Sequence, residues 1–448
     1  MLIQPPALFA AQTLITRTRG LLYAAEFTGR HRTRECDFTR NRALTFANAM
    51  GLLLQKSARS IQLHLHSLFE GLGQWMAAVT PSAWSQCRQK LRHTAFIELN
   101  AHAVLDVIYP GQSDFEVRRW RGHRLLGIDS SLLRLPDEDS VGAQFGWVEC
   151  LNSAGGCGRY PQARLSVLTD LLNRIAIETK LVPWQQGERG LAVEHLGTMA
   201  PGDLALLDRG YASYELLASF QARGRSFVCR CPKSSFTQVN QLFRDKVAGR
   251  SVLTQVSARR GDRAALRKAG LPESITLRLV TVRLSTGELE VLATSLFDEV
   301  SYPTCEFGPL YHSRWNIETY YGLIKGRLDL ERFTGRTPEA IRQDVFATIF
   351  LSNMETILTR SSEDTLQAHS QTLVHRQQVN RAVSFHAIKS QIIPLLLSQQ
   401  PTEEILHRLE QLFLSNPVSS RPQRKVPRKK PTGWRSHHYQ RSIRKIVF

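Results

Sequence analysis

The sequence lacks an apolar stretch long enough to cross a bilayer. A spanning helix needs about 18 consecutive, mostly apolar residues, and no run in the 448-residue chain approaches that length. The N-terminus also lacks the basic-then-apolar pattern of a secretory signal. We therefore expect a cytoplasmic protein that does not associate with membranes.

Acidic residues are scarce relative to basic ones. The chain has 39 Asp and Glu against 58 Lys and Arg, so that its net charge is +19 at neutral pH. This excess indicates a polyanionic partner, with nucleic acid as the first candidate and an anionic membrane surface as the second. The membrane alternative is the weaker one, because the positive charge is spread over many segments and no basic amphipathic anchor stands out.

Cysteines are few and scattered. Their odd number, seven, favours reduced thiols over a disulfide framework. Cys229 and Cys231 are one residue apart, yet no second Cys or His pair at matching spacing completes a zinc site. The run Ser226–Cys229 has the composition of a strand instead.

The N-terminal quarter of the sequence has helical periodicity. Apolar residues recur at three- and four-residue spacing over 44–54 and 61–69. Thr80 and Pro81 then provide an N-cap and a first-turn proline for a helix over 82–91.

That last helix displays hydrogen-bond donors. Gln86, Arg88 and Lys90 suit base edges and phosphates, as in a recognition helix of a DNA-binding domain. A solvated amphipathic helix explains the same pattern equally well, so that the residues alone leave both alternatives open.

Short strands alternate with helices further along the chain. We expect strands over 125–128, 164–170, 175–181 and 204–207, and helices over 191–199 and 213–222. This alternation predicts an α/β core. Residues 225–303 are mostly of β character and interrupt that core, whereas helices dominate from 305 to 415. The resulting scheme is a helical N-terminal DNA-binding domain (1–115), a catalytic core (116–224 and 304–370), a β-rich insertion (225–303), a helical C-terminal region (371–416) and a basic tail (417–448).

The basic tail cannot form a core. From Pro417 onward it contains ten Lys or Arg, several prolines and no acid. It is either a solubilising extension or an arm that contacts phosphates, and the basic character of the whole chain favours DNA contact.

Two aspartates end apolar runs. Asp129 follows Leu125–Ile128, and Asp208 follows Leu204–Leu207 and precedes Arg209. A carboxylate where a buried strand emerges is costly to desolvate unless something neutralises it, which is typical of catalytic or metal-bound acids. Each alone is weak evidence, because an Asp with a nearby Gly is commonly just a turn.

A third acid belongs to a more specific pattern. Tyr311, Arg314, Glu318 and Lys325 have the spacing Y-x2-R-x3-E-x6-K. On an α-helix, steps of three, four and seven place these residues along one face. An ion-paired helix surface would show the same spacing. The chemistry nevertheless fits phosphodiester cleavage, with Glu318 completing a metal site, Arg314 and Lys325 holding phosphates, and Tyr311 orienting one.

Three carboxylates can bind two Mg²⁺ ions, with Mn²⁺ as a substitute. Two ions about 4 Å apart stabilise the attacking and leaving oxygens of an in-line displacement. Such ions require hard oxygen ligands, which Asp129, Asp208 and Glu318 provide. We therefore predict that these three residues are both metal ligands and catalytic residues.

Taken together, the motifs resemble those of the DDE transposases of the bacterial insertion sequence four family. The resemblance rests on Asp129, on the run Asp208–Tyr211 and on the Tyr-Arg-Glu-Lys signature. It continues through Leu44–Phe46, Thr80–Ser82, Thr294–Leu296 and the basic tail, and so covers most of the chain.

This resemblance implies a ribonuclease-H-like core with Asp129 and Asp208 on adjacent strands and Glu318 on a later helix. It also implies binding of double-stranded DNA at terminal inverted repeats, cleavage, hairpin ends, joining to target DNA, and a homodimer in a synaptic complex in the bacterial nucleoid. Arg209 is a further candidate DNA contact. The region 375–415, with its apolar run Ile392–Leu397, is a candidate dimer interface or a part of the core.

One feature departs from the family pattern. Some relatives stack a Trp of the insertion on a flipped base, yet 209–303 contains no Trp. Phe227, Phe236 or Phe243 could stack instead, although core packing is the more common role for each. Hairpin formation is therefore less well supported by the sequence than metal-dependent cleavage.

Three alternatives compete with a transposase. A structure-selective nuclease on the same fold would cut DNA without joining it. A catalytically inactive, transposase-derived DNA-binding protein would do neither, and the intact acids and signature argue against it. A basic protein of the membrane surface is the third alternative.

Overall fold

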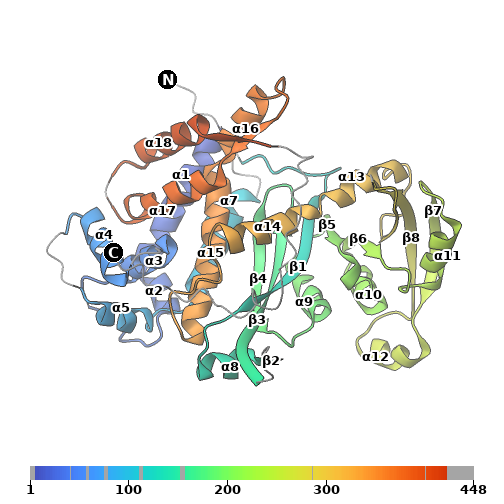
Figure 1. Cartoon of the computed structure of the whole chain (residues 1–448), viewed down its shortest axis with the longest axis horizontal. Helices are drawn as coiled ribbons and strands as arrows, with labels where there is room; N and C mark the ends of the chain where they lie inside the picture. Colours follow the sequence, from blue (N-terminus) through green and yellow to red (C-terminus); the bar gives the residue numbers. More distant parts are fainter. Residues whose placement is uncertain are drawn as a thin grey trace. The chain divides into compact units, whose positions relative to one another are not determined.

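The computed structural model describes residues 6–420, apart from 41, 57–59, 75–78, 110–114, 152–156, 285 and 399 (Figure 1). The chain forms two compact units, which are described separately below. One comprises Met1–Val117, Leu133–Gln162 and Gly322–Phe448, and the other comprises Arg118–Leu132 and Ala163–Tyr321. Most of the basic tail lies outside the described residues. No helix in the described part is long and apolar enough to span a membrane.

The first unit is mainly helical. Its helices are α1 (Pro6–Tyr23), α2 (Ala25–His31), α3 (Phe46–Gln55), α4 (Ile61–Gly71), α5 (Pro81–Arg88), α6 (Thr94–Leu99), the π-helical η1 (Asn100–Leu105), α7 (Asp106–Ile108), α8 (Asp139–Phe145), α15 (Pro338–Leu358), α16 (Arg360–His369), α17 (Arg381–Leu397) and α18 (Thr402–Ser415). Its short strands are β2 (Trp147–Leu151), β10 (Gln377–Val379) and β11 (Pro417–Ser419). The helical periodicity expected over 44–54 and 61–69 is confirmed by α3 and α4.

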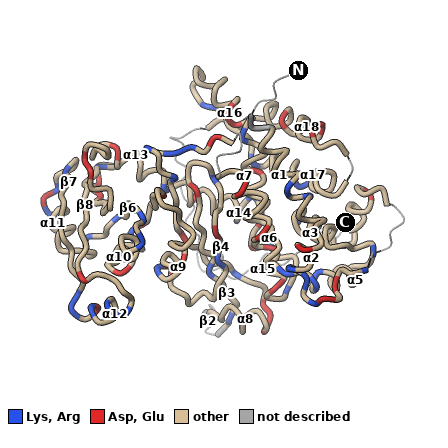
Figure 2. The backbone as a smooth tube through the Cα atoms, turned by 180° about the vertical axis from the view of Figure 1, so that it is seen from behind, with Lys and Arg blue, Asp and Glu red and all other residues tan. Residues whose placement is uncertain are grey.

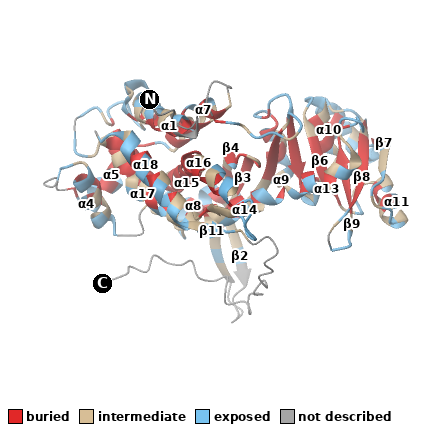
Figure 3. Cartoon of the chain, turned by 90° about the horizontal axis from the view of Figure 1, so that it is seen from above, coloured by how far each residue is buried: buried red, intermediate tan, exposed pale blue. Residues whose placement is uncertain are grey.

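Helix α15 is the centre of this unit. It begins with Thr337 as N-cap, whose hydroxyl accepts a hydrogen bond from the Ala340 amide at 3.2 Å, and with Pro338 in the first turn. The helix packs against α1, α3 and α6 and is buried around most of its circumference (Figure 3). Such a helix belongs to the core of a bundle.

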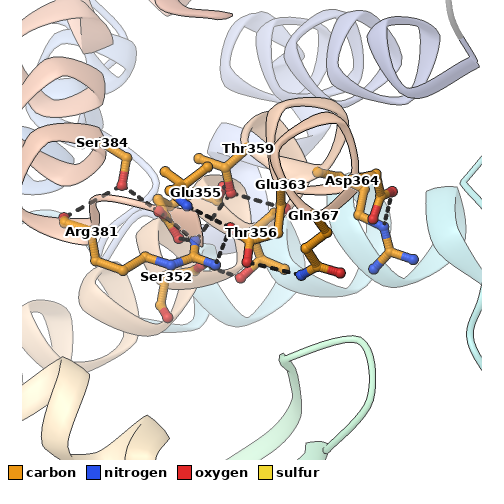
Figure 4. A network of polar contacts seen from close by, with 11 residues as sticks. Ser352, Glu355, Thr356, Thr359, Glu363, Asp364, Gln367, Arg381 and Ser384 are labelled. Carbon is orange, nitrogen blue, oxygen red and sulfur yellow. Dashed lines mark hydrogen bonds and ion pairs between the residues drawn. The ribbon is translucent and has the colours of Figure 1, made fainter. Parts of the chain in front are cut away.

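Buried polar groups on α15 are satisfied by partners on neighbouring helices. The Glu355 carboxylate accepts hydrogen bonds from the Arg381 guanidinium at 2.6 Å and from the Ser384 hydroxyl (Figure 4). Glu363 on α16 accepts a hydrogen bond from the Val379 amide at 2.9 Å. Because a buried carboxylate without a partner would be costly, this network specifies how α15, α16 and α17 pack.

The apolar run Ile392–Leu397 contributes to the core of this unit. Ile392, Leu395 and Leu396 are fully buried within the chain. Helix α17 packs mainly against α3 and α18. Of the two roles expected for this run, core packing is the one that the structure shows.

Helix α5 has the expected start but not the expected exposure. Thr80 caps it by accepting a hydrogen bond from the Ala83 amide at 3.2 Å, and Pro81 occupies the first turn. Arg88, which we expected to contact DNA, is instead 6% exposed. Its guanidinium donates to Gln343 Oε1 at 2.7 Å and to Asp344 Oδ1 at 2.8 Å on α15. Because its guanidinium is hydrogen-bonded to these acceptors, Arg88 connects α5 to α15 and is not available to a phosphate.

We predict that Arg88→Met lowers the free energy of unfolding by about 3–5 kcal/mol, because it leaves the Asp344 carboxylate buried without its cation. Urea denaturation measures the effect. Lys90→Met removes the same charge from a half-exposed position and is expected to change the stability by less than about 0.5 kcal/mol. Equal stability of the two variants would contradict the structural role of Arg88.

The second unit is built on a mixed β-sheet. Its strands are β1 (Arg124–Arg134), β3 (Cys157–Asp170), β4 (Ile175–Pro183), β5 (Asp203–Leu207), β6 (Ser226–Cys231), β7 (Ser251–Ser257), β8 (Ser274–Arg283) and β9 (Leu289–Thr294). They are ordered β3–β1–β5–β6–β9–β8–β7, with β4 also paired to β3. Strand β3 is antiparallel to β4, whereas β1, β5 and β6 are parallel.

This arrangement confirms the predicted α/β class and ribonuclease-H-like core. An antiparallel β3–β4 pair on one side of β1 and parallel strands on the other are the arrangement expected for that fold. The helices of the unit are α9 (Glu188–His195), α10 (Tyr214–Ala222), α11 (Thr237–Asp245), α12 (Arg263–Lys268), α13 (Phe307–His312) and α14 (Trp315–Gly326), with 3₁₀ turns η2 (Arg209–Tyr211), η3 (Arg260–Asp262) and η4 (Thr304–Glu306).

The β-rich stretch between residues 225 and 303 extends the same sheet. Strand β6 pairs with β5, and β9 joins β6 in the antiparallel sense, so that β8 and β7 continue the sheet. Strands β6, β8 and β9 are largely buried, whereas β7 at the edge of the sheet is mostly half-exposed or exposed (Figure 3). Phe227 on β6 is fully buried, whereas Phe236 and Phe243 are partly exposed.

Candidate active site

Asp129 lies on β1, and Asp208 directly follows the neighbouring parallel strand β5. The pairing register places Gly127 of β1 opposite Leu206 of β5, so that each aspartate comes two residues after a paired position. The two strands are therefore adjacent as expected, although Asp208 lies just beyond the end of β5. Strand β1 does not end at Asp129 but continues to Arg134, and its burial is lower over 129–132 than over 124–128.

The Asp129 carboxyl is strongly influenced by burial. Burial raises its pKa to about 6, while hydrogen bonding from the Ser130 amide at 2.8 Å and the charge of Arg314 act in the opposite direction. Glu188 and Asp208 raise it further. A carboxylate with nearby negative charges and little water is a group that a cation would stabilise.

Asp208 is oriented by a tyrosine. It directly follows β5 and caps the 3₁₀ turn η2, where its carbonyl accepts a hydrogen bond from the Tyr211 amide at 2.9 Å. The Tyr311 hydroxyl donates to the Leu207 carbonyl at 3.2 Å and contacts Asp208 Oδ1 at 3.4 Å. Burial raises the pKa of Tyr311, so that it remains a neutral donor.

The signature residues do not share one continuous helix. Helix α13 ends at His312 and α14 begins at Trp315, with Arg314 in the connection. Amide hydrogen bonds of the i→i−3 type from Arg314 to Tyr311 and from Ile317 to Arg314 tighten the chain at this point. The single helix face expected from the spacing is therefore wrong for Tyr311, whereas Glu318 and Lys325 do share α14.

Arg314 is paired with one of the three predicted acids and acts electrostatically on the other two. The residue is 6% exposed, and Nη2 donates to Glu318 Oε1 at 2.7 Å. Its charge also acts on Asp129 and on Asp208. Burial acts to lower the pKa of Arg314, but Tyr311, Glu318 and Asp208 more than offset that effect and raise it. The guanidinium is thus the countercharge that the carboxylates share.

One buried donor in this region has no hydrogen-bond partner among the described residues, namely Nε of Arg314. A buried donor without an acceptor is unfavourable. A bound group that presents an oxygen atom would satisfy it.

Tyr321 connects the helix that carries Glu318 to the strand that carries Asp129. It lies three residues after Glu318 on α14, and its buried hydroxyl donates to the Asp129 carbonyl at 2.8 Å and approaches the Leu165 carbonyl at 3.1 Å. These carbonyls belong to β1 and β3. Tyr321 therefore fixes the backbone of Asp129 relative to α14.

Helix α9 is held against the sheet at both ends. Near its end, the fully buried His195 contacts the Ser166 hydroxyl at 3.0 Å and the Glu178 carboxylate at 2.6 Å. At its start, Glu188 pairs with Arg164, which also donates to the Ser130 hydroxyl at 3.2 Å. The Ser–His–Glu contacts have triad-like connectivity, but Ser166 is fully buried and thus serves packing.

Sequence reasoning missed these positioning residues. Arg164 and Glu188 come from a strand and a helix start without any recognisable spacing relative to the acids. The pair of the partly exposed Arg230 on β6 and the buried Glu290 on β9, with 2.6 Å between Nη2 and Oε1, was missed for the same reason. Only Tyr321 had a signal, because it lies inside the signature.

The donor chemistry fits a hard divalent cation. Asp129, Asp208 and Glu318 offer carboxylate oxygens, and no thiol lies among the predicted ligands. Among the described residues, no group of three or more His, Cys, Asp or Glu is gathered closely enough to hold a metal ion. Glu318 is paired with Arg314 instead. To bind a metal ion, its carboxylate would have to leave that ion pair.

The other predicted DNA contacts differ in exposure. Arg209 and Gln86 are exposed, and Lys90 is partly exposed. Lys325 is partly buried, and its ammonium lies 3.7 Å from Glu331. Burial lowers the pKa of Lys325.

The segment of the chain that contains the three acids matches the profile of a known family. The family profile described as "Transposase DDE domain" matches residues 120–354, just over half of the chain. The chain belongs to the DDE transposases. The matched range includes all three predicted acids and the whole signature of this transposase.

Two similar proteins are transposases by name. The InsG transposase of insertion sequence element IS4 from Escherichia coli K12 is 28% identical over 237 residues, which is 52% of either protein. The transposase candidate y4zB of Sinorhizobium fredii NGR234 is 27% identical over 264 residues, or 57% of this chain and 67% of the relative. The similarity thus spans about half the length of InsG.

A solved structure has a distant likeness to the transposase. It is the piggyBac transposase synaptic complex with hairpin DNA. The match covers 92% of this chain and 86% of the piggyBac chain, at 12% sequence identity and with a TM-score of 0.43.

We predict that Asp129→Asn stabilises the metal-free transposase at pH 8 by about 1–3 kcal/mol. The folded-state pKa of about 6 lies above the ordinary value of 3.8, so that the ionised carboxylate costs stability once the pH rises through that range. Below pH 3.8 the two proteins should be equally stable. Urea denaturation in EDTA at both pH values measures this difference.

Asp262→Asn, at an exposed position, is the matched control and should have little effect at either pH. A difference between wild type and Asp129→Asn that does not depend on pH would argue against a buried, ionised Asp129.

Proposed function

We propose that the chain is an active DNA transposase that cleaves the ends of its element and joins them to target DNA. The observation that supports this most strongly is that Arg314 pairs with Glu318 and acts electrostatically on Asp129 and Asp208, in a chain of the DDE family. Phosphoryl transfer depends mainly on positioning and on charge stabilisation, and both are features of this site.

Asp129, Asp208 and Glu318 would hold two Mg²⁺ ions. When bound, such ions activate the attacking oxygen and stabilise the leaving oxygen of a phosphodiester. Tyr311 orients Asp208, Tyr321 holds the backbone of Asp129, and Arg314 keeps Glu318 close by in the absence of metal. The chain's own residues therefore fix the acids before substrate arrives.

The cations of the signature would contact the DNA backbone. A phosphate oxygen is an acceptor that would satisfy Nε of Arg314. Lys325, on the same helix as Glu318, would contribute a second charge, and Arg209 beside Asp208 a third. Recognition of terminal inverted repeats, hairpin ends and a homodimeric synaptic complex belong to the same proposal, on the strength of the family resemblance.

The central prediction concerns Glu318. Glu318→Gln should reduce cleavage of a labelled terminal inverted repeat in Mg²⁺ by at least about a thousand-fold, or ~4 kcal/mol, because a neutral amide is a poor ligand for the ion. The exposed Glu288→Gln is the isosteric control and should retain full activity. Wild-type activity in Glu318→Gln would refute the proposal.

The same assay separates a transposase from a nuclease on this fold. A transposase joins the released 3′ ends to a second, unlabelled duplex and yields a longer labelled product. A structure-selective nuclease yields cleaved ends alone.

A second prediction concerns Arg314 and Lys325. Each Gln variant should lower the slope of log affinity against log salt by about 0.9 for duplex DNA, since each removes about one phosphate contact. Arg314→Gln should also slow cleavage. Arg327→Gln removes an equal charge from an exposed position at the end of α14 and is the control. If affinity, salt slope and cleavage rate are unchanged in both variants, these residues are ordinary ion-pair partners.

A further inference from the structure

A tight hairpin of basic and aromatic residues precedes β1. Trp120 and His123 exchange two backbone hydrogen bonds of 2.9 and 2.8 Å, and the turn between them places Arg121 at φ 46° and Gly122 at φ 82°. Two consecutive residues with positive φ are the mark of a type I′ turn. Arginine rarely adopts a positive φ, so that the backbone conformation of Arg121 is energetically unfavourable.

Aromatic packing makes this hairpin rigid. The Trp120 ring stacks on Tyr302, with 5.9 Å between ring centroids and 25° between planes, and lies 6.2 Å from His123. Nε2 of His123 contacts the Tyr302 hydroxyl at 2.8 Å, and Nδ1 contacts the Gly202 carbonyl at 2.9 Å. The hairpin is therefore fixed to the start of β5 and to the segment that leads to α13.

The same hairpin concentrates positive charge. Arg118, Arg119 and Arg121 are exposed, and the Arg119 guanidinium contacts the Gly122 carbonyl at 3.4 Å. Arg121 is paired with Glu306. Figure 2 shows Lys and Arg gathered beside α13, the helix that follows Glu306. The Arg121 guanidinium is thus paired with an acid, whereas that of Arg119 contacts a backbone carbonyl.

We propose that residues 118–123 form a second contact for the phosphate backbone of duplex DNA, away from the catalytic acids. Guanidinium groups on a rigid turn match phosphate oxygens in a bidentate manner. His123 precedes Asp129 by six residues, or roughly 20 Å of extended chain. At 3.4 Å per base-pair step, a duplex lying along β1 would meet the hairpin about six base pairs from the reacting phosphate.

This inference rests on the proposed function, because it takes DNA as the polyanion. The function of the hairpin is positioning and sequence-independent affinity, as is usual for phosphate contacts. Cleavage chemistry belongs to the three acids, so that the two roles can be tested separately.

The test compares Arg119→Gln/Arg121→Gln with Arg259→Gln/Arg260→Gln, which removes the same charge from exposed positions at η3 in the same unit. Affinity for a terminal-repeat duplex and for a random duplex is measured over a range of KCl concentrations. We expect the slope of log affinity against log salt concentration to be smaller by about 1–2 in the hairpin variant than in the wild type, with both duplexes. The slope of the control variant should match that of the wild type. Arg119→Lys/Arg121→Lys should restore the slope.

The cleavage rate at saturating protein is the second readout. It should be unchanged in the hairpin variant, because the acids are intact, whereas Glu318→Gln abolishes it in the same assay. Loss of activity only in Glu318→Gln, with a wild-type salt slope in the hairpin variant, would overturn the hairpin contact and leave the transposase proposal standing. Equal slope changes in the hairpin variant and the η3 control would also overturn it, since they would reflect net charge alone.

Discussion

The electrostatics of the catalytic unit depend on one guanidinium. Arg314 is almost completely buried, yet it forms an ion pair with Glu318 and acts on the charges of Asp129 and Asp208. Without it, Asp129 would lose a charge that lowers its pKa, and Glu318 would lose its ion-pair partner. The hydroxyls of Tyr311 and Tyr321 then determine where two of those acids lie.

Much of the fold could be predicted from the sequence, because its cues are local. The apolar periodicity of α3 and α4, the Thr80–Pro81 start of α5 and the strand runs before the two aspartates all report on their own neighbourhoods. The three candidate acids rest on a different cue, namely their order along the chain together with a four-residue signature, and their catalytic role stays a prediction. Neither approach needs knowledge of tertiary contacts.

What could not be predicted depends on partners distant in sequence. Arg88 has the spacing of a surface residue, and only its contact with Asp344, 256 positions later, turns it inward. The continuation of β1 past Asp129 is fixed by backbone pairing, which side-chain polarity does not report. Arg164 donates a hydrogen bond to Ser130 and pairs with Glu188 at the start of α9, and no sequence spacing links these residues. In each case a long-range interaction outweighs the local pattern.

The break between α13 and α14 gives the signature a different meaning. In a continuous helix, Tyr311 and Glu318 would be separated by about 10 Å along one axis. The i→i−3 turn at Ser313–Arg314 instead separates two helices, so that the Tyr311 hydroxyl on α13 reaches the end of β5 while Glu318 on α14 is paired with Arg314. The first interval of the signature therefore spans this tightened turn, and inserting a single residue there would change the position of Tyr311 relative to Glu318.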